Sequence, residues 1–107
     1  MMNATLDNVF GALSHSCRRD VLAQATKGPV TVSFLAERHR MTLAGILKHL
    51  GILERASLIK TEKRGKERYV SLAKAGFTDA ADYLSYYEKF WNQQLDSLAN
   101  FLESENA

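Results

Sequence analysis

The chain has 107 residues, 46% of them hydrophobic, and carries a formal net charge of +2. This length suits one domain with a modest core, and cores of this size are often supplemented by oligomerisation. No apolar run approaches the ~20 residues that cross a membrane, and there is no signal-peptide pattern, so we expect a cytoplasmic protein without a membrane partner.

Two amphipathic helices are predicted in the first 28 residues. The first should end near residues 14–16, whose serines can also cap the second helix. The second is closed by Gly28 and Pro29, which do not continue a helix. The apolar faces comprise Leu6, Val9, Phe10 and Leu13 in the first helix and Val21, Leu22 and Ala25 in the second.

Residues 31–55 have the pattern of a helix-turn-helix. Thr31 is a good cap for one short helix and Thr42 for the next, and each helix is apolar on one side only. The turn between them, around Arg40, has about the length found in DNA-binding helix-turn-helix motifs, whose second helix enters the major groove. The apolar positions are Val32, Leu35 and Ala36, then Ile46, Leu50 and Leu53.

A β-hairpin is predicted over residues 59–72. Two strands, 59–64 and 68–72, are joined by a turn in which Gly65 supplies the conformational freedom. Exposure of the hairpin to solvent alone would explain its charged residues. However, the position of the hairpin directly after a helix-turn-helix favours contact with DNA. Its five basic residues, against two acidic ones, are Lys60, Lys63, Arg64, Lys66 and Arg68.

The last predicted helix runs from about Thr78 to the neighbourhood of Glu103. Its apolar residues alternate in steps of four and three, as at a helix–helix seam, and Tyr83, Phe90 and Phe101 widen the stripe. The helix could pack across its own domain, but the surplus aromatic surface favours a homodimer. The stripe consists of Ala80, Leu84, Tyr87, Trp91, Leu95, Leu98 and Leu102.

Charge is divided unevenly along the chain. Residues 15–74 hold 13 Lys and Arg against 5 acidic residues, whereas residues 75–107 hold 1 against 6. A basic segment suits a polyanion, because neutralised phosphates release counterions. The acidic last helix should therefore face away from the nucleic acid that the central segment is expected to bind.

Several segments, taken in order, resemble the ArsR family of small winged-helix transcription repressors. They are Ala12-Leu13-Ser14-His15-Ser16-Cys17-Arg18-Arg19-Asp20-Val21-Leu22, Leu35-Ala36-Glu37, Lys48-His49-Leu50, Ala56-Ser57-Leu58-Ile59, the wing from Arg64 to Leu72, and Phe90 to Leu98. The resemblance implies a mainly α winged helix-turn-helix domain over residues 1–107, with five helices and a two-stranded wing. It also implies a homodimer through helices at 1–14 and 77–103, bound to a palindrome-like DNA operator as a repressor.

The expected dimerisation residues are Leu6, Val9, Phe10, Leu84, Tyr87, Trp91, Leu95 and Leu98. The expected DNA-binding residues are Arg18, Arg19, Arg40, Thr42, Leu43, Ala44, Leu47, Lys48, His49, Lys63, Arg64, Lys66 and Arg68.

The second helix of the helix-turn-helix departs from the family pattern at two exposed positions. The family has Gln where this chain has Leu43 and Ser where it has Leu47, so either leucine could contact a thymine methyl instead. Leu47 could also be partly buried, and His49 could make a structural hydrogen bond. Arg40 stands where the family often has Gly, so a positive φ there would carry some strain.

Neither a metal site nor a catalytic site is predicted, and no cofactor is expected. Thr31 and Ser33 stand where family metal sensors have cysteines, and hydroxyls bind thiophilic metals poorly. Cys17 is either an ordinary semi-buried thiol or a redox-sensitive one, because a helix N-terminus beside Arg18 and Arg19 lowers a thiol pKa. No nucleophile with its base is recognisable, so the chain should not be an enzyme.

Two other functions remain open. The winged helix could serve as a protein-interaction module, or the regulator could respond to oxidation or to a small ligand. The basic wing favours DNA over a protein partner. The sequence identifies no operator, regulated gene or effector.

Overall fold

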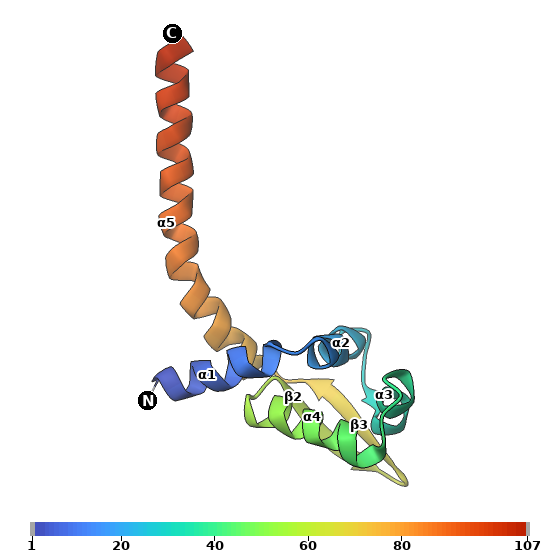
Figure 1. Cartoon of the computed structure of the whole chain (residues 1–107). Coiled ribbons are helices and arrows are strands. Elements are labelled where there is room, and N and C mark those ends of the chain that lie inside the picture. The colour runs from blue at the N-terminus through green and yellow to red at the C-terminus, as the bar shows by residue number, and fades with distance from the viewer. Residues whose placement is uncertain (1, 107) are drawn as a thin grey trace.

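The computed structural model describes residues 2–106 and the side chains of residues 5–105. The elements in chain order are α1 (Met2–Leu13), α2 (Ser16–Ala25), β1 (Val30–Thr31), α3 (Val32–Arg38), α4 (Leu43–Arg55), β2 (Ile59–Arg64), β3 (Glu67–Leu72) and α5 (Lys74–Asn106). Figure 1 shows α5 standing out from the other elements as one long helix. The predicted mainly α winged helix-turn-helix fold, with five helices, is confirmed. Residues 1 and 107, the ends of the predicted domain, lie outside the described residues.

The expected two-stranded wing is present as β2 and β3, and it belongs to a three-stranded antiparallel sheet in the order β1-β3-β2. β2 and β3 form the predicted hairpin, in register from Ile59 opposite Leu72 to Arg64 opposite Glu67. β1 adds only two residues, with Val30 opposite Val70. Local sequence pattern did not reveal β1, because its partner lies about 40 residues further along the chain.

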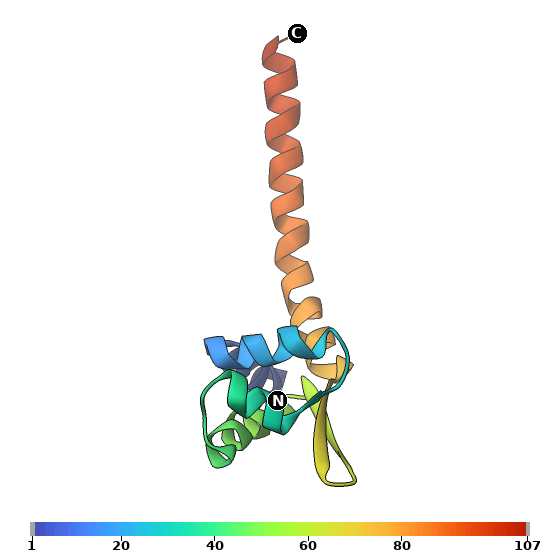
Figure 2. The same ribbon diagram turned by 90° about the vertical axis from the view of Figure 1, so that its right-hand side faces the viewer.

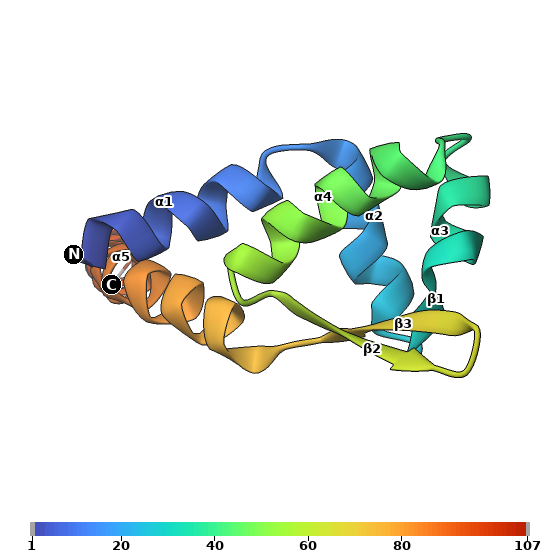
Figure 3. The same ribbon diagram turned by 90° about the horizontal axis from the view of Figure 1, so that it is seen from below.

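The core lies between α1–α4 and the inner face of the sheet. The four helices and the strands β2 and β3 all contribute fully buried side chains, and so does the turn after α4. They include Val21, Leu35, Ile46, Leu53, Leu58, Ile59 and Val70. Val9 of α1 also belongs to this core, with no exposed surface. The predicted contact of Val9 with a partner protomer does not fit this burial, because Val9 packs in the core of its own protomer. Figure 3 shows α4 between α1 and α3, where it receives contacts from several helices.

Side-chain caps begin the central helices. The hydroxyl of Thr31 accepts a hydrogen bond from Phe34 N, and that of Thr42 accepts one from Gly45 N, each at 3.1 Å, as the sequence predicted. α2 is capped by His15 rather than by a serine, because Nδ1 of His15 accepts from Cys17 N at 3.2 Å. These caps satisfy N–H groups that lack partners at helix starts.

The predicted start of α5 at Thr78 is wrong, since the helix begins four residues earlier and continues through Gly76. Gly76 N donates to Ser57 O at 2.8 Å. A Cβ at Gly76 would press on Ala56 O and lie 2.9 Å from Ser57 O. The glycine therefore lets α5 approach the turn after α4, and it does not interrupt the helix.

α5 leaves the core after Ala80, which is 8% exposed. Every side chain from residue 81 to residue 105 is exposed. Near its start, α5 contacts α1, where the Phe10 and Tyr83 rings meet edge to face with centroids 5.8 Å apart. Packing across its own domain thus explains little of the apolar stripe. Over the described part of the chain, no helix combines the length and apolarity needed to cross a membrane.

Candidate nucleic-acid interface

The helix-turn-helix and the wing lie together on one side of the molecule. Figures 1 and 2 show α4 and the tip of the β2–β3 hairpin on the side opposite the shaft of α5. Seen from that side, α4 faces the viewer with the hairpin beside it (Figure 3). The arrangement separates the basic central segment from the acidic last helix, as the charge distribution predicted.

α4 has one buried and one exposed face. Ile46, Leu50 and Leu53 are at most 2% exposed. Leu43 and Leu47, by contrast, are 57% and 41% exposed, so both present apolar surface to solvent, and Leu47 is the more covered of the two. The exposed face at the start of the helix consists of Thr42, Leu43, Ala44, Leu47 and Lys48. Of these side chains, only those of Thr42 and Lys48 can make hydrogen bonds.

The turn between α3 and α4 has the strained conformation expected of it. Arg40 has a φ of 53°, in the left-handed region that residues other than glycine rarely adopt. Met41 N donates to Ala36 O at 2.9 Å and so helps to hold the turn. The side chain of Arg40 is exposed just before the N-terminus of α4, where backbone N–H groups favour an anion.

The wing carries exposed basic side chains of two kinds. Two arginines have partners within the hairpin. The guanidinium of Arg64 lies 5.1 Å from the centre of the Tyr69 ring, and Arg68 donates to Thr61 Oγ1 at 3.2 Å. Lys63 and Lys66 are exposed near the tip. These lysines are long and flexible, so they can reach a phosphate without breaking the hairpin's own contacts.

Arg18 does not belong to this surface. It is 9% exposed, and its guanidinium donates from Nε to Ala12 O at 2.8 Å and from Nη2 to Gly11 O at 3.2 Å. The prediction that Arg18 contacts DNA does not fit this burial. Its neighbour Arg19 is exposed and donates to Leu13 O at 2.7 Å, so both arginines satisfy carbonyls at the end of α1.

His49 is half-buried on the inner side of α4. Its Nδ1 lies 3.0 Å from Nη1 of Arg18, and its ring centre lies 4.7 Å from that of His15. Burial lowers the pKa of His49, and the nearby His15 and Arg18 lower it further. Of the two alternatives for this residue, the geometry favours the structural one.

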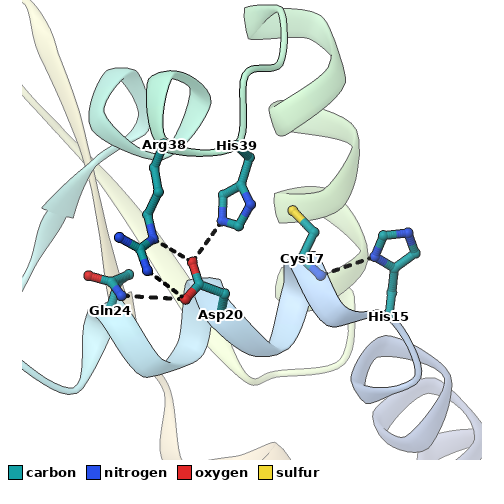
Figure 4. Close-up of polar contacts among 6 residues, drawn as sticks. All are labelled: His15, Cys17, Asp20, Gln24, Arg38 and His39. Carbon is teal, nitrogen blue, oxygen red and sulfur yellow. Dashed lines mark hydrogen bonds and ion pairs between the residues drawn. The ribbon is translucent and has the colours of Figure 1, made fainter.

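A polar cluster between α2 and α3 was missed in the sequence. Figure 4 shows Asp20 of α2 facing Arg38, His39 and Gln24. His39 Nε2 lies 2.8 Å from Asp20 Oδ2, as an electrostatic contact rather than a well-aligned hydrogen bond. The hydrogen bonds from Arg38 are the main cause that lowers the pKa of Asp20 to about 2. Asp20 and Arg38 are 18 residues apart and lie on different helices, so no local sequence pattern indicates the pair.

Cys17 lacks the properties of a reactive thiol. It is buried, and burial raises its pKa, with a further increase from the Asp20 carboxylate that outweighs the opposite effect of Arg18. Of the two alternatives for Cys17, its burial favours the ordinary semi-buried thiol. Among residues 5–105, no three His, Cys, Asp or Glu side chains lie close enough together to hold a metal ion.

The expected dimerisation residues other than Val9 are at least partly exposed. Leu6 is half-buried and Phe10 is 37% exposed on α1. The α5 residues among them are between 44% and 60% exposed, namely Leu84, Tyr87, Trp91, Leu95 and Leu98. Between α1 and α5 lies a hollow of about 370 Å³, lined by Thr5, Leu6, Asp79, Asp82 and Tyr83.

Comparison with known proteins identifies relatives that cover most of the chain. No family model matches it. The transcriptional repressor SdpR of Bacillus subtilis (strain 168) is 30% identical over 79 residues, which cover 74% of this chain and 88% of SdpR. The crystal structure of an ArsR family transcriptional regulator is 34% identical, covers 84% of this chain and 93% of its own, and has a TM-score of 0.77. A homodimeric winged helix-turn-helix DNA-binding domain from Mycobacterium bovis shares the fold, at 19% identity over 87% of this chain and 83% of its own, with a TM-score of 0.62.

Proposed function

Because the chain belongs to the ArsR family of transcriptional regulators, we propose that it is a homodimeric, sequence-specific DNA-binding repressor without a metal site. One observation carries this proposal. The exposed face of α4 and the basic wing lie on the same side of the molecule, away from the acidic α5. Such a protein acts by binding and not by catalysis, and this role would place it in the cytoplasm.

The proposed DNA contacts divide by chemistry. The start of α4 would enter the major groove, where side chains meet base edges. The wing, the turn at Arg40 and the exposed Arg19 would meet phosphates, which supply affinity and salt dependence. Arg18 and His49 are left out because they contact each other inside the domain. The proposed contacts are Arg19, Arg40, Thr42, Leu43, Ala44, Leu47, Lys48, Lys63, Arg64, Lys66 and Arg68.

A homodimer is the arrangement that best covers the stripe on α5. Leu95 and Trp91 are each 60% exposed, on a helix that projects from its own core. Exposed apolar patches of this kind usually mark association surfaces. The Mycobacterium bovis domain with this fold is homodimeric, which supports the same assembly here. Two-fold symmetry would present two α4 helices to half-sites about one DNA turn apart on a palindrome-like operator.

Repression is proposed from relatives and not from the site. SdpR, at 30% identity, is a transcriptional repressor. A dimer seated on a promoter would block polymerase without any further activity. Expression of a reporter from the bound promoter should therefore rise when the gene for this protein is deleted.

The test is binding of the purified protein to fluorescent duplexes from the DNA upstream of its own gene, against scrambled duplexes, over a salt series. A preferred duplex, with affinity falling steeply as salt rises, would support the proposal. Lys48→Ala should weaken binding, and Lys63→Ala with Lys66→Ala should flatten the salt slope by up to about two units. Lys89→Ala removes a lysine charge from α5, on the opposite side of the molecule, and should change neither the affinity nor the salt slope. Equal affinity of all these proteins would contradict the proposed surface.

A protein-interaction module is the second candidate. The exposed Leu43 and Leu47 favour it, together with Phe34 of α3, which is 45% exposed. In that case, binding to both kinds of duplex would be equally weak. Loss of partner binding on substitution of Leu43 or Leu47, with no effect of the wing lysines, would then identify the role.

A further inference from the structure

Arg18 joins two helices that have different roles in the proposed function. Its Nε and Nη2 donate to Ala12 O and Gly11 O in the last turn of α1, where carbonyls lack intrahelical partners. Its Nη1 lies 3.0 Å from Nδ1 of His49 in the middle of α4. Among the side chains of residues 5–105, Arg18 is the only charged one that is buried. A single guanidinium therefore contacts the proposed dimerisation helix and the proposed recognition helix.

The contact specifies the protonation state of His49. A guanidinium only donates hydrogen bonds, so Nδ1 of His49 must accept and the ring must be neutral, with its proton on Nε2. His15 uses its Nδ1 in the same way, as the acceptor from Cys17 N. The charged or titratable groups that act on His49 are His15 and Arg18 of the α2 side, His39 after α3, and Lys48 of α4. All of them are basic, so protonation of His49 would add a positive charge that none of them compensates.

We propose that Arg18 is a positioning residue, which holds α4 in register with α1 through neutral His49, and that protonation of His49 releases this link. The inference rests on the proposed function, because α1 would help to form the dimer and α4 would enter the groove. The apolar contacts among Val9, Ile46 and Leu50 keep the helices together but are non-directional. The hydrogen bonds of Arg18 add direction, and so help to set the distance between the two half-sites.

The sign of the pH effect separates this inference from simple electrostatics. Extra positive charge on a DNA-binding helix should strengthen binding as pH falls. Loss of the link should weaken binding by about tenfold, which is the lower end of what one hydrogen bond to a charged group contributes. Two substitutions at His49 provide the comparison. Asn places an acceptor near the position of Nδ1 and does not titrate, whereas Leu removes the acceptor at every pH.

The experiment measures operator affinity from pH 8 to pH 5 for the wild type, His49→Asn and His49→Leu, with the fold checked by circular dichroism. The wild type should lose affinity at low pH, while His49→Asn should stay nearly constant although it keeps His15 and His39. His49→Leu should be weak throughout. It should also discriminate less than the wild type against operators whose half-sites are moved by one base pair, a property that a loss of stability alone would leave unchanged.

The outcomes distinguish this inference from the proposed function. A wild type with no operator preference at pH 8 would overturn both. A wild type that binds its operator at pH 8 but binds equally or more tightly at pH 5 would overturn the inference alone. So would a His49→Asn protein that loses affinity in parallel with the wild type, or a His49→Leu protein that retains full discrimination of half-site spacing.

Discussion

Nε of Arg38 lies 2.7 Å from Oδ2 of Asp20, and Nη2 of the same guanidinium lies 3.1 Å from Oδ1 (Figure 4). The pair joins α3, the first helix of the helix-turn-helix, to α2. Two parallel hydrogen bonds fix the geometry of an arginine–carboxylate pair more tightly than one would. They also stabilise the ionised carboxylate, which lowers the pKa of Asp20 to about 2.

Asp20→Asn should lower the melting temperature by a few degrees at neutral pH, because the charge that holds Arg38 is lost. The pKa of Asp20 in the folded protein lies below its ordinary value of 3.8. Its contribution to stability is therefore fully present above pH 3.8 and disappears as pH falls through about 2. Thermal unfolding of both proteins at pH 7, 4, 3 and 2 measures this convergence, which should be about half complete at pH 3. Glu37→Gln, a neighbouring substitution on the exposed side of α3, should show no comparable effect, and an equal effect would contradict the role of Asp20.

Gly76→Ala should destabilise the protein by about 1–3 kcal/mol, because an overpacked site forces its neighbours to move. The new Cβ would lie 2.8 Å from Leu58 Cδ2 and 2.9 Å from Ser57 O. Gly11→Ala is the matched control, since a Cβ at this exposed helical position meets nothing within 4 Å. It should stabilise the protein by about 1 kcal/mol through helix propensity. Urea unfolding measures the free energy of unfolding of both variants. A change in the same direction for Gly76→Ala and Gly11→Ala would contradict this account.

The elements found correctly in the sequence are those whose signals are local. Thr31 and Thr42 cap helices whose apolar residues repeat at helical spacing, and both the spacing and the caps are visible within a few residues. The hairpin was equally visible, because Gly65, with a φ of 62°, separates two short β-rich runs. The two faces of α4 follow from the same periodicity.

Sequence was least informative for residues whose role depends on distant partners. Arg18 has the sequence context of a surface cation and becomes buried only because α1 and α4 meet around it. Gly76 has the context of a helix breaker, but the fold requires a small residue inside α5. Cys17 has basic neighbours that would lower a thiol pKa, yet burial has the larger effect. Tertiary packing, which no local pattern reports, decides each case.

The α4 surface leads to a prediction about the operator. Leu43 and Leu47 can offer apolar contact to thymine methyl groups but cannot form hydrogen bonds to bases. Replacing thymidine by deoxyuridine in the operator removes only the methyl group of the base. Each contacted methyl should contribute about fourfold to affinity, by analogy with burial of one methylene. Wild-type binding to thymine and deoxyuridine duplexes, measured by fluorescence anisotropy, should differ at the contacted positions.

Leucine variants make this prediction specific. In Leu43→Ala and Leu47→Ala, the thymine and deoxyuridine duplexes should bind almost equally at the position that the lost side chain contacted. Lys48→Ala should keep the full difference while binding both duplexes more weakly. If the wild type binds the two duplexes equally at every position, the leucines do not recognise thymine methyl groups.

The exposed apolar stripe on α5 predicts that one charged substitution there separates the proposed dimer into monomers. Leu95→Asp would place a carboxylate, which resists desolvation, at the centre of the proposed dimer contact beside Trp91. Light scattering should then show a monomer at concentrations where the wild type is a dimer. Gln93→Asp adds the same charge about 200° around the helix and should leave the dimer intact. Circular dichroism of the Leu95→Asp monomer should still show the helices of residues 5–80, whose core does not involve Leu95. A Leu95→Asp protein that remains dimeric would mean that the apolar face of α5 is not the subunit contact.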